Sequence, residues 1–289
     1  MNVIEFEDYS WRYLDTERPA LKDITLAIEE GEFIGVIGAN GSGKTTLSYS
    51  INGLIPGQYH GVKKGEVVVF DQEVEKYDTG ALQHKVGMVF SDPEAQFTAM
   101  TVEDELVFGM ENLGMNLQEI TERLEWVVAL TELGPLLTKP PYELSGGQKQ
   151  RVAVGAVLAM TPEILIMDEP TSMLDPISRT RVFDVLEEIK KEQNNTIIVV
   201  EHSLEKLVPL ADRMLLLDQG EMVLFEETQT FFEQMPMILE KGISPPGILQ
   251  FFHKLQTDHT YSKKLPLTIE ESVKILSQMI DAKTKDKQL

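Results

Sequence analysis

The chain has 289 residues, which allows one large domain or two smaller ones, and 42% of them are hydrophobic, as in ordinary globular proteins. Because it lacks cysteine, it has neither disulfides nor thiolate metal sites, and no apolar run approaches the roughly 20 residues that cross a bilayer. The formal net charge is −21, nearly all of it before residue 226, which argues against nucleic-acid binding. This charge either keeps the protein in solution or serves the recognition of a partner.

Short β-type runs alternate with helical segments along the chain, and this pattern is typical of an α/β fold with a largely parallel sheet. The first two predicted strands, 3–6 and 24–28, alternate apolar and polar residues and indicate an antiparallel β subdomain. Residues 53–65 are rich in Gly and Pro and are predicted to form a loop. Further strands are predicted at 33–37, 67–70, 86–90, 164–167, 196–200, 214–217 and 222–225.

The character of the sequence changes between about residues 92 and 150. Segments 102–113 and 117–130 have helical spacing and many acids, and nothing there resembles a buried strand. We therefore expect a helical subdomain at about 92–150, inserted into a core formed by 1–91 and 151–225. After residue 225, short amphipathic pieces separated by prolines predict a small helical C-terminal extension, 226–289.

A glycine-rich segment lies between the predicted strand 33–37 and a predicted helix at 45–52. It reads Gly38-Ala39-Asn40-Gly41-Ser42-Gly43-Lys44-Thr45, which fits the pattern G-x-x-x-x-G-K-[ST]. In such a segment backbone N–H groups converge on phosphates at a helix N-terminus. We expect Lys44 to reach the β- and γ-phosphates, the Thr45 hydroxyl to bind Mg²⁺, and Thr46 to belong to the same site. The segment predicts a P-loop NTPase core.

Two acids follow the apolar strand predicted at 164–167. They are Asp168 and Glu169, and they emerge at the carboxyl end of the strand, where open α/β sheets bind their ligands. We expect Asp168 to hold the Mg²⁺ shell and Glu169 to orient and deprotonate the attacking water.

A second candidate anion site is Leu144-Ser145-Gly146-Gly147-Gln148, at the start of a helix predicted to run to about residue 160. Ser145 is a good N-cap, and the two glycines leave free N–H groups at the positive end of the helix. Since the chain already has one phosphate site, this second one makes most sense if it grips ATP bound to a partner subunit. These residues match the LSGGQ signature in full, and from about residue 2 to 225 the chain resembles the ABC ATPases.

The resemblance implies roles for four more residues. Asp175, in Ser172-Met173-Leu174-Asp175, resembles the D-loop residue that crosses the dimer interface, and His202 resembles the switch histidine that contacts the γ-phosphate. Tyr13 resembles the aromatic residue that stacks on adenine. Ser91 stands where ABC ATPases usually carry a metal-shell glutamine, and it could reach Mg²⁺ only through water. Either Ser91 performs this role less well, or hydrolysis is slow, or a partner subunit compensates.

Several short segments narrow the resemblance to ATPases of energy-coupling factor (ECF) and cobalt-type importers. They are 52–56, 92–97, 102–105, 108–109, 201–202, 242–246 and 265–268. This implies an ATPase dimer, of two copies or of this chain with a related one, which binds ATP and Mg²⁺ and docks on integral membrane transport subunits. The solute, of the vitamin or metal-ion class, binds to a separate membrane protein. In such importers the coupling helices of a membrane subunit present arginines. We expect these arginines to bind in an acidic groove formed by Glu94, Glu103, Asp104 and Glu105.

The N-terminus has neither the basic nor the apolar part of a signal peptide, so we expect the chain to stay in the cytoplasm, peripheral to the membrane. Two alternatives stay open. One is a regulatory or weakly hydrolysing ABC subunit, which Ser91 favours and which Glu169 and His202 oppose. The other is a soluble ABC protein that acts on DNA or ribosomes, which the acidic charge and the single ATPase cassette oppose.

Overall fold

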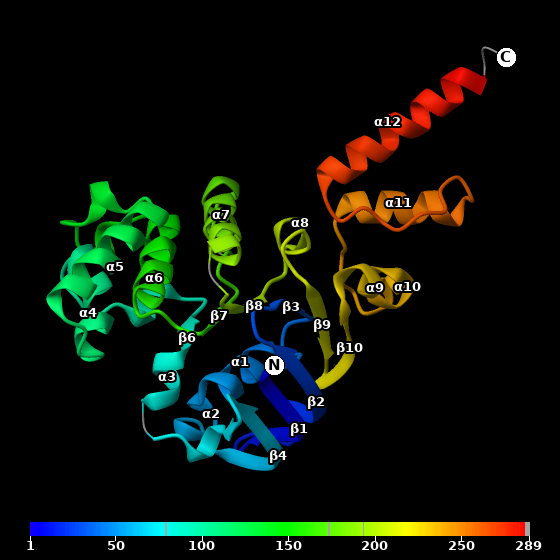
Figure 1. The fold of residues 1–289 in the computed structure, drawn as a ribbon. Coiled ribbons are helices and arrows are strands. Elements are labelled where there is room, and N and C mark those ends of the chain that lie inside the picture. Colours follow the sequence, from blue (N-terminus) through cyan, green and yellow to red (C-terminus); the bar gives the residue numbers. More distant parts are fainter. Residues whose placement is uncertain (79, 173, 193, 287–289) are drawn as a thin grey trace.

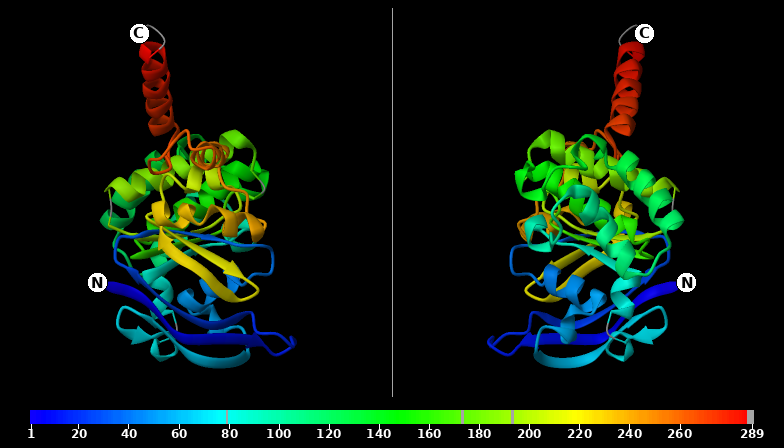
Figure 2. Two further views of the ribbon diagram at one scale, coloured as in Figure 1. Left: turned by 90° about the vertical axis from the view of Figure 1, so that its right-hand side faces the viewer. Right: turned by 90° about the vertical axis from the view of Figure 1, so that its left-hand side faces the viewer.

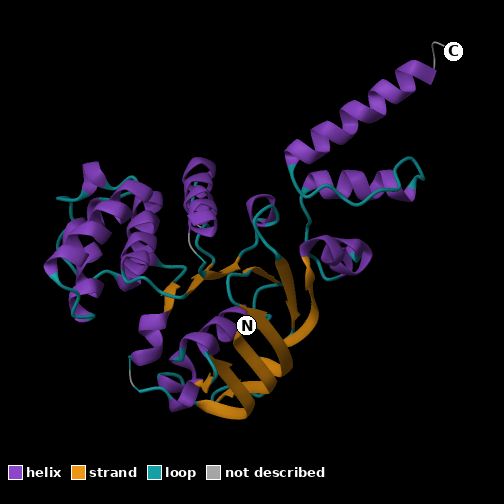
Figure 3. Cartoon of the chain, in the orientation of Figure 1, coloured by secondary structure: helices purple, strands orange, loops and turns teal. Residues whose placement is uncertain are grey.

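The computed structural model describes residues 1–78, 80–172, 174–192 and 194–286, with side chains to residue 281. Its strands form two sheets: the larger lies among the helices, and the smaller, with β1, β2 and β4, lies at the lower edge of the view (Figure 1, Figure 3). The predicted α/β architecture with an antiparallel β subdomain is confirmed. No helix in the described part of the chain is long and apolar enough to span a bilayer.

The smaller sheet is antiparallel and has the strand order β2-β1-β4-β5. Its strands are β1 (Asn2–Tyr13), β2 (Leu21–Glu29), β4 (Gly61–Val69) and β5 (Gln72–Glu73). Alternation along β1 buries Ile4 and Phe6 on one face, as the sequence pattern requires. The strand is three times as long as the predicted one because irregular pairing between Glu7 and Ser10 lets it continue beyond the first alternating run.

The larger sheet has the order β10-β9-β3-β8-β7-β6, and only β10 runs antiparallel to its neighbour. Its strands are β3 (Phe33–Ile37), β6 (Val86–Val89), β7 (Ile164–Asp168), β8 (Thr196–Val200), β9 (Arg213–Asp218) and β10 (Glu221–Glu227). Strands β3, β6, β7 and β8 are buried at every residue, which explains their continuous apolar runs. The carboxyl ends of β3, β7 and β8 therefore meet at one edge.

Each face of the larger sheet supports its own hydrophobic core. One core joins Ile34, Ile166 and the smaller sheet to helix α1 (Lys44–Asn52). The other joins Phe33 and Leu165 to the helices on the opposite face. Short elements near α1 are α2 (Leu54–Gly57), the 3₁₀ turn Val74–Lys76 and α3 (Ala81–Lys85). The predicted loop 53–65 was therefore wrong at both ends, since α2 and the start of β4 fall within it.

Helices dominate the chain between β6 and β7, and Figure 1 shows α4, α5 and α6 gathered at one side of the sheet. They are α4 (Val102–Asn112), α5 (Leu117–Leu130) and α6 (Gly146–Ala159), with 3₁₀ turns at Pro93–Gln96, Gly134–Leu136 and Pro141–Glu143. Thr101 caps α4, and Asn116 forms a capping box at α5. Helices α7 (Pro176–Glu192) and α8 (Leu204–Leu207) follow β7 and β8. The division of the chain at residues 92, 150 and 225 stays a prediction.

The C-terminal part is helical, as the sequence predicts. Its helices are α9 (Thr228–Glu233), α10 (Met235–Glu240), α11 (Gly247–Thr257) and α12 (Ile269–Asp286). Phe231, Phe232 and Phe252 belong to the same hydrophobic core as Phe33 and Leu165. Helices α9 and α11 therefore pack as part of the main domain. In Figure 2, α12 extends away from the rest of the molecule.

Gly65 marks the most demanding turn of the smaller sheet. Its φ is +72°, and a Cβ there would lie 2.2 Å from the carbonyl oxygen of Glu7. Gly114 has almost the same φ, +71°, but open space around it. We expect Gly65→Ala to lower the free energy of unfolding by about 3 kcal/mol and Gly114→Ala by about 1 kcal/mol, because only the first adds a clash to the strain. Equal losses in urea titrations would contradict the steric argument.

Candidate nucleotide site

The phosphate loop connects β3 to α1. Gly43, the N-cap of α1, has a φ of +106°, and a Cβ at this position would lie 2.5 Å from the carbonyl oxygen of Ala20. Only glycine fits such a left-handed, crowded position. In the described part of the chain no side chain caps the first turn of α1, so its N–H groups remain available to an anion. Of the other predicted loop residues, Asn40 and Gly41 are exposed, whereas Gly38 and Ser42 are buried.

Lys44 lies inside this loop with 5% of its surface exposed. Its ammonium donates hydrogen bonds to the carbonyl oxygens of Gly38 at 3.0 Å and Ala39 at 3.1 Å, and it lies 3.9 Å from Oε1 of Glu169. Burial lowers the pKa of Lys44, and the nearby carboxylates of Glu169 and Asp168 only partly oppose this shift. An anion at the start of α1 would supply the missing counter-charge.

Asp168 ends β7 beside the first turn of α1. Its Oδ2 accepts a hydrogen bond of 2.8 Å from the Thr45 hydroxyl, whereas its Oδ1 is buried and has no hydrogen-bond partner among the described residues. Burial raises the pKa of Asp168, and the hydrogen bond from Thr45 opposes the rise. A carboxylate oxygen without a partner, next to a hydroxyl, fits a hard cation that prefers oxygen ligands, such as Mg²⁺.

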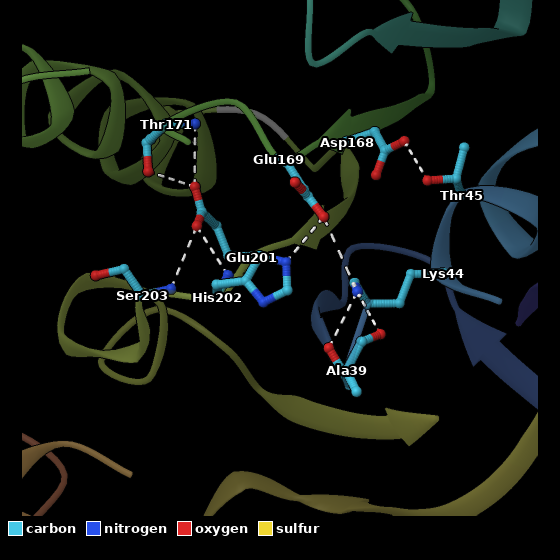
Figure 4. A network of polar contacts seen from close by, with 10 residues as sticks. Ala39, Lys44, Thr45, Asp168, Glu169, Thr171, Glu201, His202 and Ser203 are labelled. Carbon is cyan, nitrogen blue, oxygen red and sulfur yellow. Dashed lines mark hydrogen bonds and ion pairs between the residues drawn. The ribbon is translucent and has the colours of Figure 1, made fainter. Parts of the chain in front are cut away.

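Glu169 and His202 meet above the phosphate loop (Figure 4). Oε1 of Glu169 lies 2.9 Å from Nε2 of His202 and also faces Lys44. The backbone of Glu169 has a φ of +52°, so the chain turns sharply as it leaves β7. The structure thus brings together five predicted residues from three segments: Lys44, Thr45, Asp168, Glu169 and His202.

Glu201 accepts several hydrogen bonds near the site, a role that was not predicted from the sequence. Its buried carboxylate accepts hydrogen bonds from Thr171, His202 and Ser203, and so connects the loops that follow β7 and β8 (Figure 4). The available signal was a charged residue at the end of an apolar strand. That signal alone does not show which donors converge on the carboxylate.

Tyr13 lies near α1, the helix that follows the phosphate loop. Its hydroxyl is 3.2 Å from Oγ1 of Thr46, and its ring meets Tyr59 edge to face with 6.2 Å between centroids. Tyr59 in turn stacks on Tyr49 at 5.3 Å. Tyr49 and Tyr59 were missed, because tyrosines in a helix and in a loop carry no motif. Together with Tyr13 they form an aromatic cluster beside α1.

Ser91 stands apart from the cluster. It is exposed, and among the described residues it makes no hydrogen bond to Thr45 or Asp168. The side chain that reaches back to the end of β6 is Gln96, whose Oε1 accepts a long bond of 3.5 Å from the N–H of Phe90.

The signature segment forms a second, separate site. Ser145 caps α6 in a capping box with Gln148, and Ser145 and Gly146 are exposed. Within the described chain, no hydrogen bond or ion pair joins residues 145–148 to residues 38–46. The N–H groups at the start of α6 therefore do not contact this chain's own phosphate loop and are available to another anion.

Asp175 belongs to the same surface as the signature segment. It accepts bonds from the N–H groups of Ile177 and Ser178 and from the Ser178 hydroxyl, and so caps α7. A Cβ on Gly147 would lie 2.2 Å from that hydroxyl, which shows how closely α6 approaches α7 here. Ile177 beside it is 69% exposed. Met173 of the predicted D-loop lies outside the described residues.

Comparison with known proteins places the chain in one family. The ABC transporter family model matches residues 21–172. The energy-coupling factor transporter ATP-binding protein EcfA1 of Caldanaerobacter subterraneus is 36% identical over 278 residues, which cover 95% of this chain and 98% of that protein.

Two solved structures share the fold. The cbiO1 protein of Clostridium perfringens, part of the ABC transporter complex cbiONQ, has a TM-score of 0.73 and 29% identity and covers 88% of this chain and 99% of its own. The dimeric ATP-binding cassette MJ0796, bound to ADP and Pi, has a TM-score of 0.68 and 28% identity. It covers 78% of this chain and 98% of its own. The chain belongs to the ABC transporter family, as an ATP-binding subunit of the ABC ATPase type.

Proposed function

We propose that this chain is the ATP-binding and hydrolysing subunit of an ECF-type importer, which takes up a vitamin or metal-ion class solute. The observation that carries the proposal is the cluster of Lys44, Thr45, Asp168, Glu169 and His202 at one edge of the sheet. The names of EcfA1 and cbiO1 support the importer assignment. The subunit acts at the cytoplasmic face of the cell membrane.

In this proposal each residue of the cluster has a role in hydrolysis. Lys44 and the N–H groups at the start of α1 hold the phosphates of ATP, while Tyr13 stacks on adenine. Thr45 and Asp168 hold Mg²⁺, which neutralises charge on the phosphates. Glu169 takes the proton of the attacking water, and His202 orients that carboxylate and the γ-phosphate. Ser91 contacts the metal shell only through water.

The exposed signature segment supports a dimer in which each subunit completes the site of the other. Ser145 and the N–H groups of Gly146 and Gly147 bind the γ-phosphate of ATP held by the partner. Asp175 lies on the same face and crosses the interface. The partner is a second copy of this chain or a related ATPase.

The docking surface for the membrane subunit is smaller than the sequence predicts. Glu105 is buried, and its carboxylate accepts the N–H groups of Thr98 and Ala99, so it cannot receive an arginine. Glu94 is paired with Lys149 at 2.6 Å. Glu103 and Asp104 remain exposed in the first turn of α4. We propose that these two acids bind the coupling-helix arginines.

Reversing both charges, with Glu103→Lys and Asp104→Lys, is expected to reduce co-purification with the membrane subunits by at least about 10-fold, because like charges then face each other. The matched control is Glu122→Lys with Glu125→Lys, which reverses two exposed charges on α5. ATP turnover of the isolated subunit verifies folding. If both double variants assemble like the wild type, the docking surface lies elsewhere.

A further inference from the structure

Glu201 directly follows β8 and has only 2% of its surface exposed. Its Oε1 accepts the N–H of Thr171 at 3.1 Å and the Thr171 hydroxyl. Its Oε2 accepts the N–H of His202 at 2.9 Å and that of Ser203 at 3.3 Å. One oxygen thus faces the loop after β7 and the other faces the loop after β8 (Figure 4).

The backbone around Glu201 adds a third connection. The N–H of Glu201 donates to the carbonyl oxygen of Val36 on β3 at 3.2 Å, one residue from the end of that strand. The N–H of Glu169 donates to the carbonyl oxygen of Val200 at 2.9 Å. Glu201 therefore sits where the strands that lead to the phosphate loop, to Glu169 and to His202 come together.

Its burial is costly for a carboxylate unless donors surround it. No Lys, Arg or His side chain forms an ion pair with Glu201 in the described part of the chain, so its four hydrogen bonds carry the stabilisation. Glu169 leaves β7 with a positive φ, a conformation that persists only when its surroundings hold it. Thr171, two residues later, is held by Glu201.

We propose that Glu201 is a positioning residue for hydrolysis. Its carboxylate holds the two loops at the separation that keeps Nε2 of His202 2.9 Å from Oε1 of Glu169. This inference rests on the proposed roles of Glu169 and His202. Glu201 touches neither Lys44 nor Thr45 through any hydrogen bond of the described chain, so its loss should slow the chemical step and leave ATP binding intact.

The test is steady-state ATP turnover by the full chain with Glu201→Gln. A carboxamide keeps the shape, but its NH₂ group must face donors at Thr171 or at His202 and Ser203, so one loop is released. We expect kcat to fall by about 10- to 100-fold, because a small misplacement of a catalytic group has that effect. KM for Mg-ATP should change by less than about twofold.

Thr171 provides a second variant in case Glu201→Gln does not fold. Thr171→Val removes the hydroxyl donor to Glu201, and Thr171→Ser keeps it. The valine variant should lower kcat and the serine variant should recover it. Combined with Glu201→Gln, Thr171→Val should lower kcat little further, since both changes remove the same contact.

Asp212→Asn is the matched structural control. Asp212 accepts the N–H of Phe33 at 2.8 Å, at the start of β3 and away from the site, so this variant should keep the wild-type kcat. An equal fall in kcat for Asp212→Asn and Glu201→Gln would overturn the proposal, as would a folded Glu201→Gln with wild-type kcat. If Glu169→Gln also turns over ATP normally, the proposed function fails; if only Glu201→Gln does, the positioning role alone fails.

Discussion

Glu169→Gln is expected to reduce ATP turnover by at least about 100-fold, the usual contribution of a general base. The glutamine amide keeps the size of the side chain but cannot accept a proton from water. Oε1 of Glu169 lies between Nε2 of His202 and Nζ of Lys44, so the carboxylate is oriented from two sides. The rate of phosphate release at saturating Mg-ATP measures the effect.

ATP affinity of this variant should stay near that of the wild type, because Lys44 and the start of α1 are unchanged. The closed dimer should therefore accumulate with ATP, which size-exclusion chromatography with light scattering detects. Glu163→Gln, an exposed acid just before the first residue of the same strand, is the matched control and should hydrolyse ATP normally. Normal turnover by Glu169→Gln would refute the base assignment. Weak turnover in the wild type as well would favour a regulatory subunit.

Lys44→Met is expected to weaken Mg-ATP binding by about 30-fold or more, the cost of removing one partner from a buried charged contact. The ammonium already lies in the loop and holds the carbonyl oxygens of Gly38 and Ala39. Burial penalises its charge, as the lowered pKa of Lys44 indicates. A phosphate would relieve that penalty, and methionine offers no such gain.

The unliganded Lys44→Met variant should unfold close to the wild-type temperature, because relief of a buried charge offsets two lost hydrogen bonds. Its thermal shift at the same concentration of Mg-ATP should be much smaller, since stabilisation by a ligand falls as its Kd rises. Lys22→Met, which removes an exposed lysine paired with Glu221, should keep the full shift. A full shift in both variants would exclude Lys44 from the phosphate site.

The central residues of the site could be predicted from short sequence patterns. The segments 38–45 and 164–169 carry their chemistry in consecutive residues, and the parallel sheet brings their ends together. The continuous apolar strands β3, β7 and β8 were predicted to within one residue for the same reason. Capping by Ser145 was also predictable, because a cap acts within one turn of helix.

Side-chain contacts that belong to no sequence motif could not be predicted. Glu105 is part of an acidic run in the sequence, yet tertiary structure buries it against the backbone of Thr98 and Ala99. The four donors to Glu201 come from two loops 30 residues apart along the chain. The helix α2 and the start of β4 lie in a Gly- and Pro-rich segment, where packing against α1 decides the structure.

The central claim is that the phosphate loop of one subunit works with the signature segment of another. Lys44→Met disables the first and Ser145→Arg blocks the second, so each variant alone should be inactive. A mixed dimer would hold one site in which both parts are intact. Equal amounts of the two variants, mixed and assayed for ATP turnover, should recover up to about a quarter of the wild-type rate. A mixture of folded variants no more active than either one alone would contradict the shared ATP site.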